Sequence, residues 1–380
     1  MSNPLIDLQK EGQSVWYDNI RRSLITSGEL KQLVDNGVMG VTSNPAIFEK
    51  AIDGGSEYDE QIESIHTMHP DHIFERVAVQ DIQHAADVLR PVYDRTNRHD
   101  GYISMEVSPT LANDTKGSIA EARRLHKEID RPNVMIKIPA TPAGIPAIEE
   151  LISEGVNVNV TLIFAIDAYQ QVIEAYLKGL ERRKGDLSSI ASVASFFVSR
   201  VDSNVDKRLE QIMKDKPEMS AQVKPLLGKA AIANARLAYQ AFLGHFKAGP
   251  NVGRFQALAA RGAQLQRPLW ASTGTKNPAY SDVLYVEQLI GPDTVNTMPP
   301  ATIDAFKEHG QVKRTVDSGA DAAAETIRQL AAIGVDMREV TDQLLDEGVR
   351  LFADAFSTLI AAIDLKRKRL KSLALDEKAH

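Results

Sequence analysis

Eight short apolar segments, most of them separated by longer stretches with helical spacing, restrict the fold of this chain more than any other feature. Strands that alternate with helices form parallel sheets, because each helix returns the chain to the start of the next strand. Eight such units predict a closed (β/α)8 TIM barrel, an α/β fold. An open doubly wound sheet is the main alternative, but no G-x-G-x-x-G sequence follows any segment. The predicted strands are residues 15–18, 40–43, 103–107, 134–139, 156–164, 190–198, 269–272 and 295–298.

Four longer segments predict helices: residues 71–95, which begin with Asp71 as a cap, 203–213, 225–246 and 337–371. The last has an apolar stripe from Val340 to Ile363 and predicts a long C-terminal helix. Its basic end, residues 366–371 (KRKRLK), is expected to be solvated, where positive charge suits the helix dipole. We find no linker, so residues 1–380 are predicted to form one barrel domain with helical insertions near 53–95 and 202–264.

Composition narrows the function classes. The chain has 380 residues, 43% of them hydrophobic, and a net charge of −7, which argues against nucleic acid or an anionic membrane as the main partner. Without cysteine there can be no disulfide, thiolate metal site or cysteine nucleophile. No apolar run approaches the roughly 20 residues of a membrane span, and the N-terminal residues lack the pattern of a signal peptide. We therefore expect a cytoplasmic enzyme.

One lysine interrupts the apolar strand at residues 134–139 (VMIKIP). Ile136 and Ile138 share one face of the strand, so Lys137 points the opposite way, into the barrel. An interior ammonium is costly unless it is paired or loses its proton, and a neutral lysine amine is the nucleophile that forms Schiff bases with carbonyl substrates. From the residues alone, a lysine that reaches the surface or pairs with a carboxylate stays an open alternative.

Other strands place polar side chains on the same inward face. Alternation puts Ser104 and Glu106 on one face of their strand, and it does the same for three polar residues of the strand at 156–164. The outer face of each barrel strand meets helices, so the polar set faces the interior. Two carboxylates in different surroundings could divide the proton transfers of carbonyl chemistry. The candidate residues that we expect to converge on one cavity are Lys137, Glu106, Asn157, Asn159, Thr161, Asp18 and Asn44.

With these residues in place, the chain resembles the transaldolase family, whose members are class I aldolase-type enzymes with a (β/α)8 barrel. The matching segments follow the family order and span most of the chain. They are GVTSNPAIF (40–48), SMEV (104–107), MIKIPAT (135–141), EGVNVNVTLIF (154–164), SFFVSR (195–200) and ASTGTKN (271–277).

The resemblance implies roles for individual residues. Lys137 matches the Schiff-base lysine, and Asp18 matches the acid/base that takes the C4 hydroxyl proton. Glu106 and Thr161 match the pair that holds a catalytic water. The residues that match groups hydrogen-bonding the dihydroxyacetone unit are Asn44, Asn159 and Ser195.

The substrate's phosphate and the outcome of cleavage depend on three further positions. Arg200 matches the family's phosphate-binding arginine, a role that suits a guanidinium. Where relatives often have a second arginine, the nearest cation here is Lys276, in what looks like a longer loop. Phe197 stands where fructose 6-phosphate aldolases carry a tyrosine, and a phenylalanine cannot donate a proton. Phe196 and Ser199 replace the proline and glycine found in many relatives.

The resemblance thus implies a cofactor-independent and metal-independent transaldolase acting on small sugar phosphates in the pentose phosphate pathway. The alternatives are an aldolase that releases dihydroxyacetone, a non-catalytic barrel that binds sugar phosphates, and a metal-dependent isomerase. His66, His69 and His72 have metal-like spacing, but Pro70 interrupts their helical face and no ligand partner has suitable spacing. No feature of the sequence fixes the oligomeric state.

Overall fold

The eight predicted strands form a closed, all-parallel barrel with the order β1-β2-β3-β4-β5-β6-β7-β8. The computed structural model describes residues 3–377, with side chains described as far as residue 372. The closed order confirms the barrel and makes the open doubly wound sheet wrong. The strands are β1 Gln13–Tyr17, β2 Val38–Val41, β3 Ile103–Glu106, β4 Val134–Pro139, β5 Val158–Ile163, β6 Ser192–Phe197, β7 Gln266–Ala271 and β8 Thr294–Met298.

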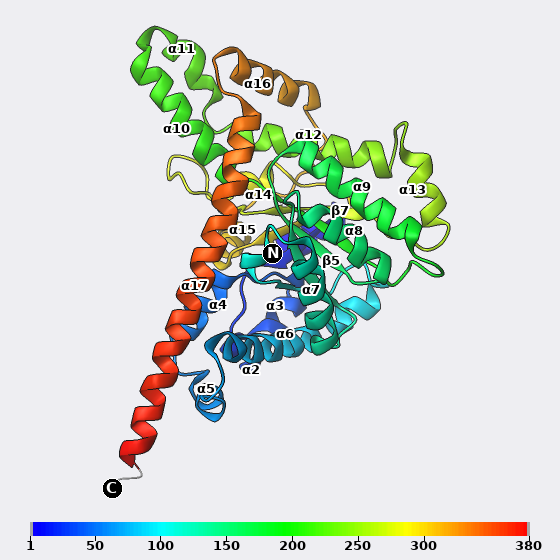
Figure 1. Cartoon of the computed structure of the whole chain (residues 1–380). Helices are drawn as coiled ribbons and strands as arrows, with labels where there is room; N and C mark the ends of the chain where they lie inside the picture. Colours follow the sequence, from blue (N-terminus) through cyan, green and yellow to red (C-terminus); the bar gives the residue numbers. More distant parts are fainter. Residues whose placement is uncertain (1–2, 378–380) are drawn as a thin grey trace.

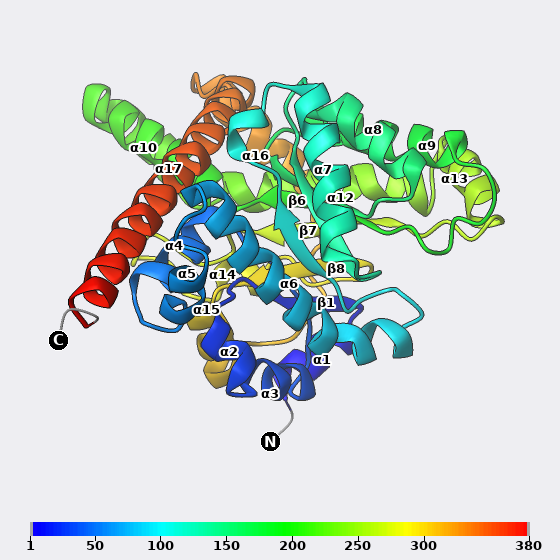
Figure 2. The same cartoon turned by 60° about the horizontal axis from the view of Figure 1, so that its bottom comes forward.

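Helices cover the outside of the barrel (Figures 1 and 2). The first part of the chain contributes α1 Pro4–Lys10, α2 Arg22–Thr26, α3 Glu29–Asp35, α4 Pro45–Asp53, α5 Asp59–Ser64, α6 Pro70–Arg95, η1 Pro109–Leu111, α7 Thr115–Ile129, α8 Gly144–Glu154 and α9 Ile166–Arg182. The second part contributes α10 Ser199–Asp215, η2 Pro217–Met219, α11 Ser220–Val223, η3 Lys224–Leu226, α12 Ala230–Phe246, α13 Val252–Ala259, α14 Leu284–Glu287, α15 Pro300–His309, α16 Ala320–Ala332 and α17 Met337–Glu377. No helix among residues 3–377 is both long and apolar enough to cross a membrane.

The predicted helices are present, with one error at a cap. Helix α6 begins at Pro70, and His69 occupies the cap position without a side-chain hydrogen bond. Asp71 therefore lies inside the first turn and does not cap the helix. A proline suits the first helical position, because its missing N–H is not needed there.

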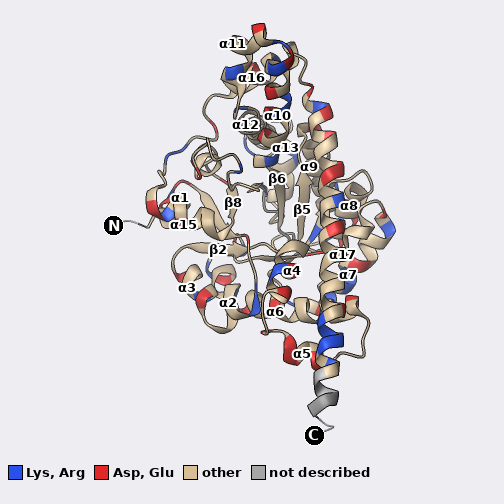
Figure 3. Ribbon diagram, turned by 90° about the vertical axis from the view of Figure 1, so that its left-hand side faces the viewer, with Lys and Arg blue, Asp and Glu red and all other residues tan. Residues whose placement is uncertain are grey.

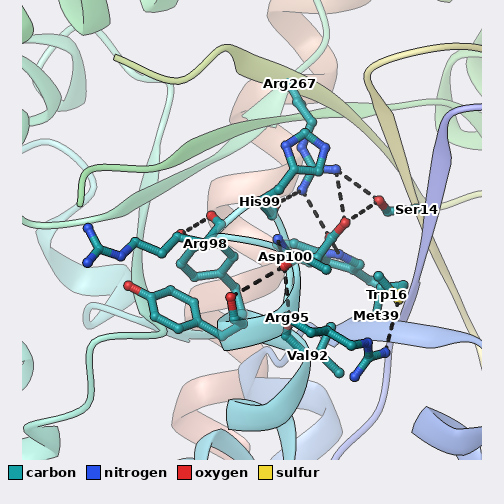
Figure 4. Close-up of polar contacts among 12 residues, drawn as sticks. Ser14, Trp16, Met39, Val92, Arg95, Arg98, His99, Asp100 and Arg267 are labelled. Atoms are coloured by element: carbon teal, nitrogen blue, oxygen red, sulfur yellow. Dashed lines mark hydrogen bonds and ion pairs between the residues drawn. The ribbon is translucent and has the colours of Figure 1, made fainter. Parts of the chain in front are cut away.

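A buried polar cluster closes the barrel at the N-terminal ends of the strands (Figure 4). Arg267 of β7 pairs with Asp100 at 3.0 Å and also donates to the Ser14 hydroxyl at 2.9 Å. Asp100 accepts further bonds from the Ser14 hydroxyl at 2.6 Å and the Trp16 indole N–H at 2.8 Å. Both charged side chains are almost fully buried, so their mutual pairing and the added hydrogen bonds offset part of the cost of burying charge. This cluster is the floor of the barrel interior.

Helix α17 runs along one side of the molecule, from the α10, α11 and α16 group to α5 (Figure 1). Its predicted apolar stripe packs inward, with Val340 and Ile363 completely buried. Gly348 lies against β5, where a Cβ atom would approach the Leu162 side chain to 2.9 Å. Leu162 itself has a φ of 57°, an uncommon value for a residue other than glycine. The contact brings α17 close to the C-terminal end of the barrel.

The basic end of α17 lies beside α5 (Figure 3), and its contacts differ from the predicted solvation. Lys366 is 8% exposed, pairs with Asp59 at 2.7 Å and donates to the Ile52 carbonyl at 2.8 Å. Arg367 donates to the carbonyl oxygens of His66 and Met68 at 3.2 and 3.1 Å. These two residues therefore fasten the helix to the α4–α6 region and are not merely solvated.

Candidate active site

A cavity of about 610 Å³ opens at the C-terminal ends of the barrel strands, where parallel barrels place their active sites. Its wall includes side chains that follow β1, β2, β6, β7 and β8, together with the upper inner residues of β4 and β5. Eight of the eleven predicted site residues line it: Asp18, Asn44, Lys137, Thr161, Ser195, Phe197, Arg200 and Lys276. Two more, Glu106 and Asn159, lie beside it and are bonded to members of the wall.

Lys137 is buried on the inner face of β4, as alternation predicts, and it is paired. Its Nζ atom lies 3.3 Å from Oε2 of Glu106 on β3 and donates to the Ser43 carbonyl at 3.0 Å. The β3–β4 register places Glu106 directly opposite Lys137. Lys137 therefore has a carboxylate within ion-pair distance, which is the geometry that the open alternative described. Burial raises the pKa of Glu106, and the neighbouring Lys137 opposes that rise.

Asp18 provides the second carboxyl group, directly after β1. Its Oδ1 atom accepts a hydrogen bond of 2.7 Å from the Thr42 hydroxyl, and Thr42 lies 2.6 Å from the Thr297 hydroxyl. Burial raises the pKa of Asp18, while the hydrogen bond from Thr42 and the charge of Lys137 act to lower it. The cavity thus holds a carboxyl group whose pKa is raised, because burial outweighs the two effects that favour the anion. Thr42 was not predicted, although alternation from Gly40 would have placed it inward.

A chain of hydrogen bonds joins three strands beneath the cavity. Ser195 of β6 donates to Asn159 Oδ1 at 2.7 Å, and Asn159 Nδ2 donates to the Ser104 hydroxyl at 2.9 Å. Asn157 does not join this group. Its amide binds the carbonyls of Pro132 and Val134 near the start of β4, so its predicted place in the cavity is wrong. Alternation gives the face of a strand, but position along the strand decides which end of the barrel a side chain reaches.

Thr161 and Asn44 complete the deeper wall. The Thr161 hydroxyl is completely buried and has no hydrogen-bond partner among the described residues. An unpaired buried hydroxyl costs about 1–3 kcal/mol, so this group is suited to bind a substrate or a water molecule. Asn44 has two uses, because it lines the cavity and its Oδ1 accepts from the Ile47 N–H at 3.0 Å as the cap of α4.

Arg200, the second residue of α10, brings a guanidinium group to the cavity. Its Cζ atom lies 5.3 Å from the centre of the Phe197 ring, a cation–π distance. In the described part of the chain no carboxylate lies within 4 Å of Arg200, so its charge is free to meet a ligand. Desolvation lowers the pKa of Arg200, and Glu347 of α17 opposes that effect.

Further cations surround the mouth of the cavity. Lys276 lines it from the loop after β7, as predicted, and two cations that sequence reasoning missed are Arg21 and Lys50. Arg21 pairs loosely with Glu29 at 3.5 Å. Asp18 is the only carboxylate among the lining residues, against Arg21, Lys50, Lys137, Arg200 and Lys276. A cavity with this balance attracts an anionic ligand.

Phe352 of α17 is a lining residue that the sequence did not reveal. Its ring centre lies 5.8 Å from Lys137 Nζ, although the two residues are separated by more than half of the chain. The apolar stripe of α17 indicated that Phe352 is buried, but only the tertiary position of the helix shows where.

The histidines show no metal arrangement. His66 contacts the Glu63 carbonyl, and His69 lies 3.4 Å from Asp71. Within the described part of the chain, no group of three or more His, Cys, Asp or Glu side chains could hold a metal ion.

A model of the transaldolase/fructose-6-phosphate aldolase family matches residues 15–363. The chain belongs to this family. Transaldolase 2 of Nostoc sp. (strain PCC 7120) is 49% identical over 379 residues, which cover 97% of this chain and 98% of the relative. Transaldolase 1 of Streptomyces avermitilis is 48% identical, with 96% of each chain covered, and the transaldolase of Trichodesmium erythraeum is 47% identical, with 97% and 99% covered. This similarity along the whole chain confirms the resemblance inferred from the motifs and identifies the protein as an enzyme of the transaldolase type.

Proposed function

We propose that the protein transfers a dihydroxyacetone unit between sugar phosphates through a Schiff base on Lys137. The donor would be a ketose phosphate such as sedoheptulose 7-phosphate or fructose 6-phosphate. The acceptor would be an aldose phosphate such as glyceraldehyde 3-phosphate or erythrose 4-phosphate. One observation carries the proposal: Lys137 lies in the wall of a cation-lined cavity, 3.3 Å from Glu106 and in the same cavity as Asp18.

The Lys137–Glu106 pair supplies the nucleophile. A proton that moves from the Lys137 ammonium to Glu106 leaves a neutral amine and a neutral carboxyl group, and burial favours such neutral forms. The raised pKa of Glu106 supports this transfer. The amine then attacks the C2 carbonyl carbon, and water leaves as the iminium forms. The Thr161 hydroxyl, which has no partner among the described residues, is suited to hold that water.

Asp18 performs the bond cleavage. Its carboxylate takes the proton from the C4 hydroxyl, the C3–C4 bond breaks, and the electron pair moves into the iminium to give an enamine. The aldose phosphate leaves. In the second half-reaction, C3 of the enamine attacks the acceptor aldehyde, the new hydroxyl takes the proton from Asp18, and water hydrolyses the iminium to free Lys137. Ser195, Asn159 and Asn44 would hydrogen-bond the three-carbon unit, and the phosphate would bind Arg200 and Lys276.

Transfer is favoured over release of free dihydroxyacetone by the residue beside Ser195. Phe197 has no proton to donate to the enamine, and no tyrosine is among the residues that line the cavity. The relatives similar along the whole chain are named transaldolase. The broader family also contains fructose-6-phosphate aldolases, so release of dihydroxyacetone remains the second candidate function. The pentose phosphate pathway, a cytoplasmic location and a reaction without metal or cofactor are parts of the same proposal.

The test is chemical trapping. Fructose 6-phosphate and borohydride are added to the protein, and the product is analysed by intact mass and peptide mapping. We expect a reduced three-carbon adduct on Lys137, and no adduct with Lys137→Ala. Lys50→Ala is the matched control, because it removes another lysine of the same cavity but should leave the adduct intact. A Lys137→Ala variant with normal turnover would refute the mechanism.

A second measurement separates transfer from release. Turnover of fructose 6-phosphate is followed with and without erythrose 4-phosphate, because glyceraldehyde 3-phosphate is the aldose that this donor itself releases. A transaldolase requires the acceptor for continued turnover. Equal rates in both conditions would favour the aldolase instead.

A further inference from the structure

The loop between β7 and α14, residues 272–283, carries Lys276 and is fastened to α10 near both of its ends. At its beginning, the Ser199 N–H donates to the Ser272 carbonyl at 3.1 Å, and the two serine hydroxyls lie 2.9 Å apart. Ser272 has a φ of 56°, an uncommon backbone conformation that the surrounding contacts must hold in place. The start of the loop is therefore set by the first residue of α10.

Two buried aspartates of α10 hold the other end. Asp206 Oδ2 accepts from the Tyr280 hydroxyl at 2.7 Å, and Asp202 Oδ2 accepts from the Tyr285 hydroxyl at 2.8 Å. The two aspartates are four residues apart and share one face of the helix. Neither aspartate makes an ion pair within 4 Å of a described cation, although they are 1% and 6% exposed. Their negative charge is satisfied by hydrogen bonds.

Each carboxylate accepts a second hydrogen bond with its other oxygen, Asp206 from the segment before α12 and Asp202 from the first turn of α12. Asp206 Oδ1 accepts from the Gly228 N–H at 2.9 Å, and Asp202 Oδ1 accepts from the Ala231 N–H at 2.7 Å. Gly228 has a φ of 68°, and a Cβ atom there would lie 2.8 Å from Cζ of Tyr280. Glycine is thus needed both for the backbone conformation and for the close approach of the tyrosine. Burial raises the pKa of Tyr280, and the adjacent Asp206 adds to that effect, so the phenol stays a donor.

Helix α10 also carries Arg200, two residues before Asp202. Arg200 and Lys276 line the same cavity, and neither has an ion-pair partner within 4 Å in the described residues. A lysine ammonium is a point charge on a flexible stem, so the backbone that carries it must be fixed if it is to meet a phosphate at a defined place.

We infer that Tyr280 and Tyr285, held by Asp206 and Asp202, are positioning residues that fix the β7–α14 loop so that Lys276 meets the phosphate group of the substrate beside Arg200. This inference rests on the proposed function, because it assigns the phosphate end of the sugar to that pair of cations. It adds four residues that touch neither the substrate nor the reacting atoms. It also explains how a lysine on a long loop can serve where a shorter loop would present an arginine.

The experiment removes one hydroxyl group with Tyr280→Phe. We expect KM for fructose 6-phosphate and the inhibition constant of inorganic phosphate to rise roughly three- to ten-fold, because one hydrogen bond to a charged group is lost. The value of kcat should stay within about two-fold, since no reacting group is moved. Tyr176→Phe is the matched control, because its hydroxyl donates to the Gln264 carbonyl at 2.7 Å, outside the loop. It should leave both constants unchanged.

A double mutant tests whether the tyrosine acts through the lysine. Lys276→Met should raise the same two constants, and Tyr280→Phe should then add little in the Lys276→Met background. Additive losses would overturn the inference, and so would unchanged constants in a Tyr280→Phe protein of native melting temperature. Tyr285→Phe gives an independent repeat if Tyr280→Phe folds poorly.

Two measurements distinguish a failure of the positioning role from a failure of the proposed function. Calorimetric binding of inorganic phosphate needs no turnover, so it reports on the loop even if the reaction is another one. The borohydride adduct on Lys137 reports on the chemistry and should form in every one of these variants. Loss of that adduct in the native protein counts against the proposed reaction. Unchanged phosphate binding in Tyr280→Phe counts against the positioning role.

Discussion

At the scale of single residues, the site depends on carboxyl groups whose ionisation is opposed by burial. Asp18 and Glu106 both have a raised pKa, and desolvation is the main cause in each. Each is also bonded to one group that favours the anion, Thr42 for Asp18 and Lys137 for Glu106. Removing such a partner should therefore raise the pKa of the carboxyl group further.

Thr42→Val tests this balance at Asp18. Loss of the hydroxyl removes a hydrogen bond to the carboxylate, so the pKa of Asp18 should rise. Because the proposed base must be ionised, activity on the acidic side should then begin at a higher pH, and kcat near neutrality should fall about ten-fold. The check is the pH dependence of kcat. Thr42→Ser keeps the hydroxyl and should keep the native profile, and an acidic limb that stays in place in Thr42→Val would contradict the prediction.

At the scale of secondary-structure elements, α17 is the helix that links the barrel to distant parts of the chain. Phe352 reaches the cavity, Gly348 lies against Leu162 of β5, and Lys366 is bound to the α4–α5 region. The helix therefore contributes to the site through the turn that carries Phe352 and to the stability of the fold through the turn that carries Lys366.

Lys366→Met should destabilise the protein by about 3 kcal/mol, because it leaves the Ile52 and Gly55 carbonyls and Asp59 without their buried partner. Lys368→Met, two residues further on, removes an exposed pair with Asp364 and should cost no more than about 0.5 kcal/mol. Denaturant unfolding of the two variants gives the comparison. Equal losses would show that the buried contacts of Lys366 carry no particular weight.

Phe352→Ala should admit water to the enamine bound on Lys137. We expect release of dihydroxyacetone without acceptor to rise about five-fold or more, because the ring no longer covers the reacting nitrogen. Phe356→Ala, one turn along the helix, removes a ring that lines the adjoining cavity of about 560 Å³ and should have a much smaller effect. The measurement is a colorimetric or chromatographic assay of free dihydroxyacetone.

The elements and their inward faces could be predicted because strand periodicity and barrel closure are local and geometric rules. Lys137 and Glu106 follow from alternation within single strands. The errors concern position along a strand and the packing of a distant helix, neither of which strand alternation specifies. Asn157 has the predicted face but lies near the wrong end of the barrel. The contacts of Lys366 and Phe352 depend on where α17 packs, a helix that begins nearly 200 residues after the end of β4.

At the scale of the whole molecule, the charge of the cavity is opposite to that of the chain. The protein carries a net charge of −7, yet five Lys and Arg residues line the cavity with Asp18 as the single carboxylate. Such a local reversal focuses the electrostatic field at the mouth and raises the encounter rate of anionic substrates.

The reversal predicts a selective effect of salt. Between about 0.02 M and about 0.5 M salt, kcat/KM for fructose 6-phosphate should fall by roughly ten-fold as the field is screened. Turnover of unphosphorylated fructose with erythrose should change little over the same range. Steady-state kinetics with both substrate pairs provide the check, and equal salt dependence for the two would argue against electrostatic attraction of the phosphate.

The buried cluster of Arg267, Asp100 and Ser14 has a consequence for the order of events in a catalytic cycle. Because these side chains are buried and bonded to one another at the N-terminal end, they close that end to a sugar, so substrates enter and products leave at the opposite end. Under the proposed chemistry, the first aldose has to vacate the space above Lys137 before the second can occupy it. Double-reciprocal plots of the initial rate against donor concentration, at several acceptor concentrations, should therefore give parallel lines. This is the pattern of ping-pong kinetics, in which the three-carbon unit stays on the enzyme between the two half-reactions.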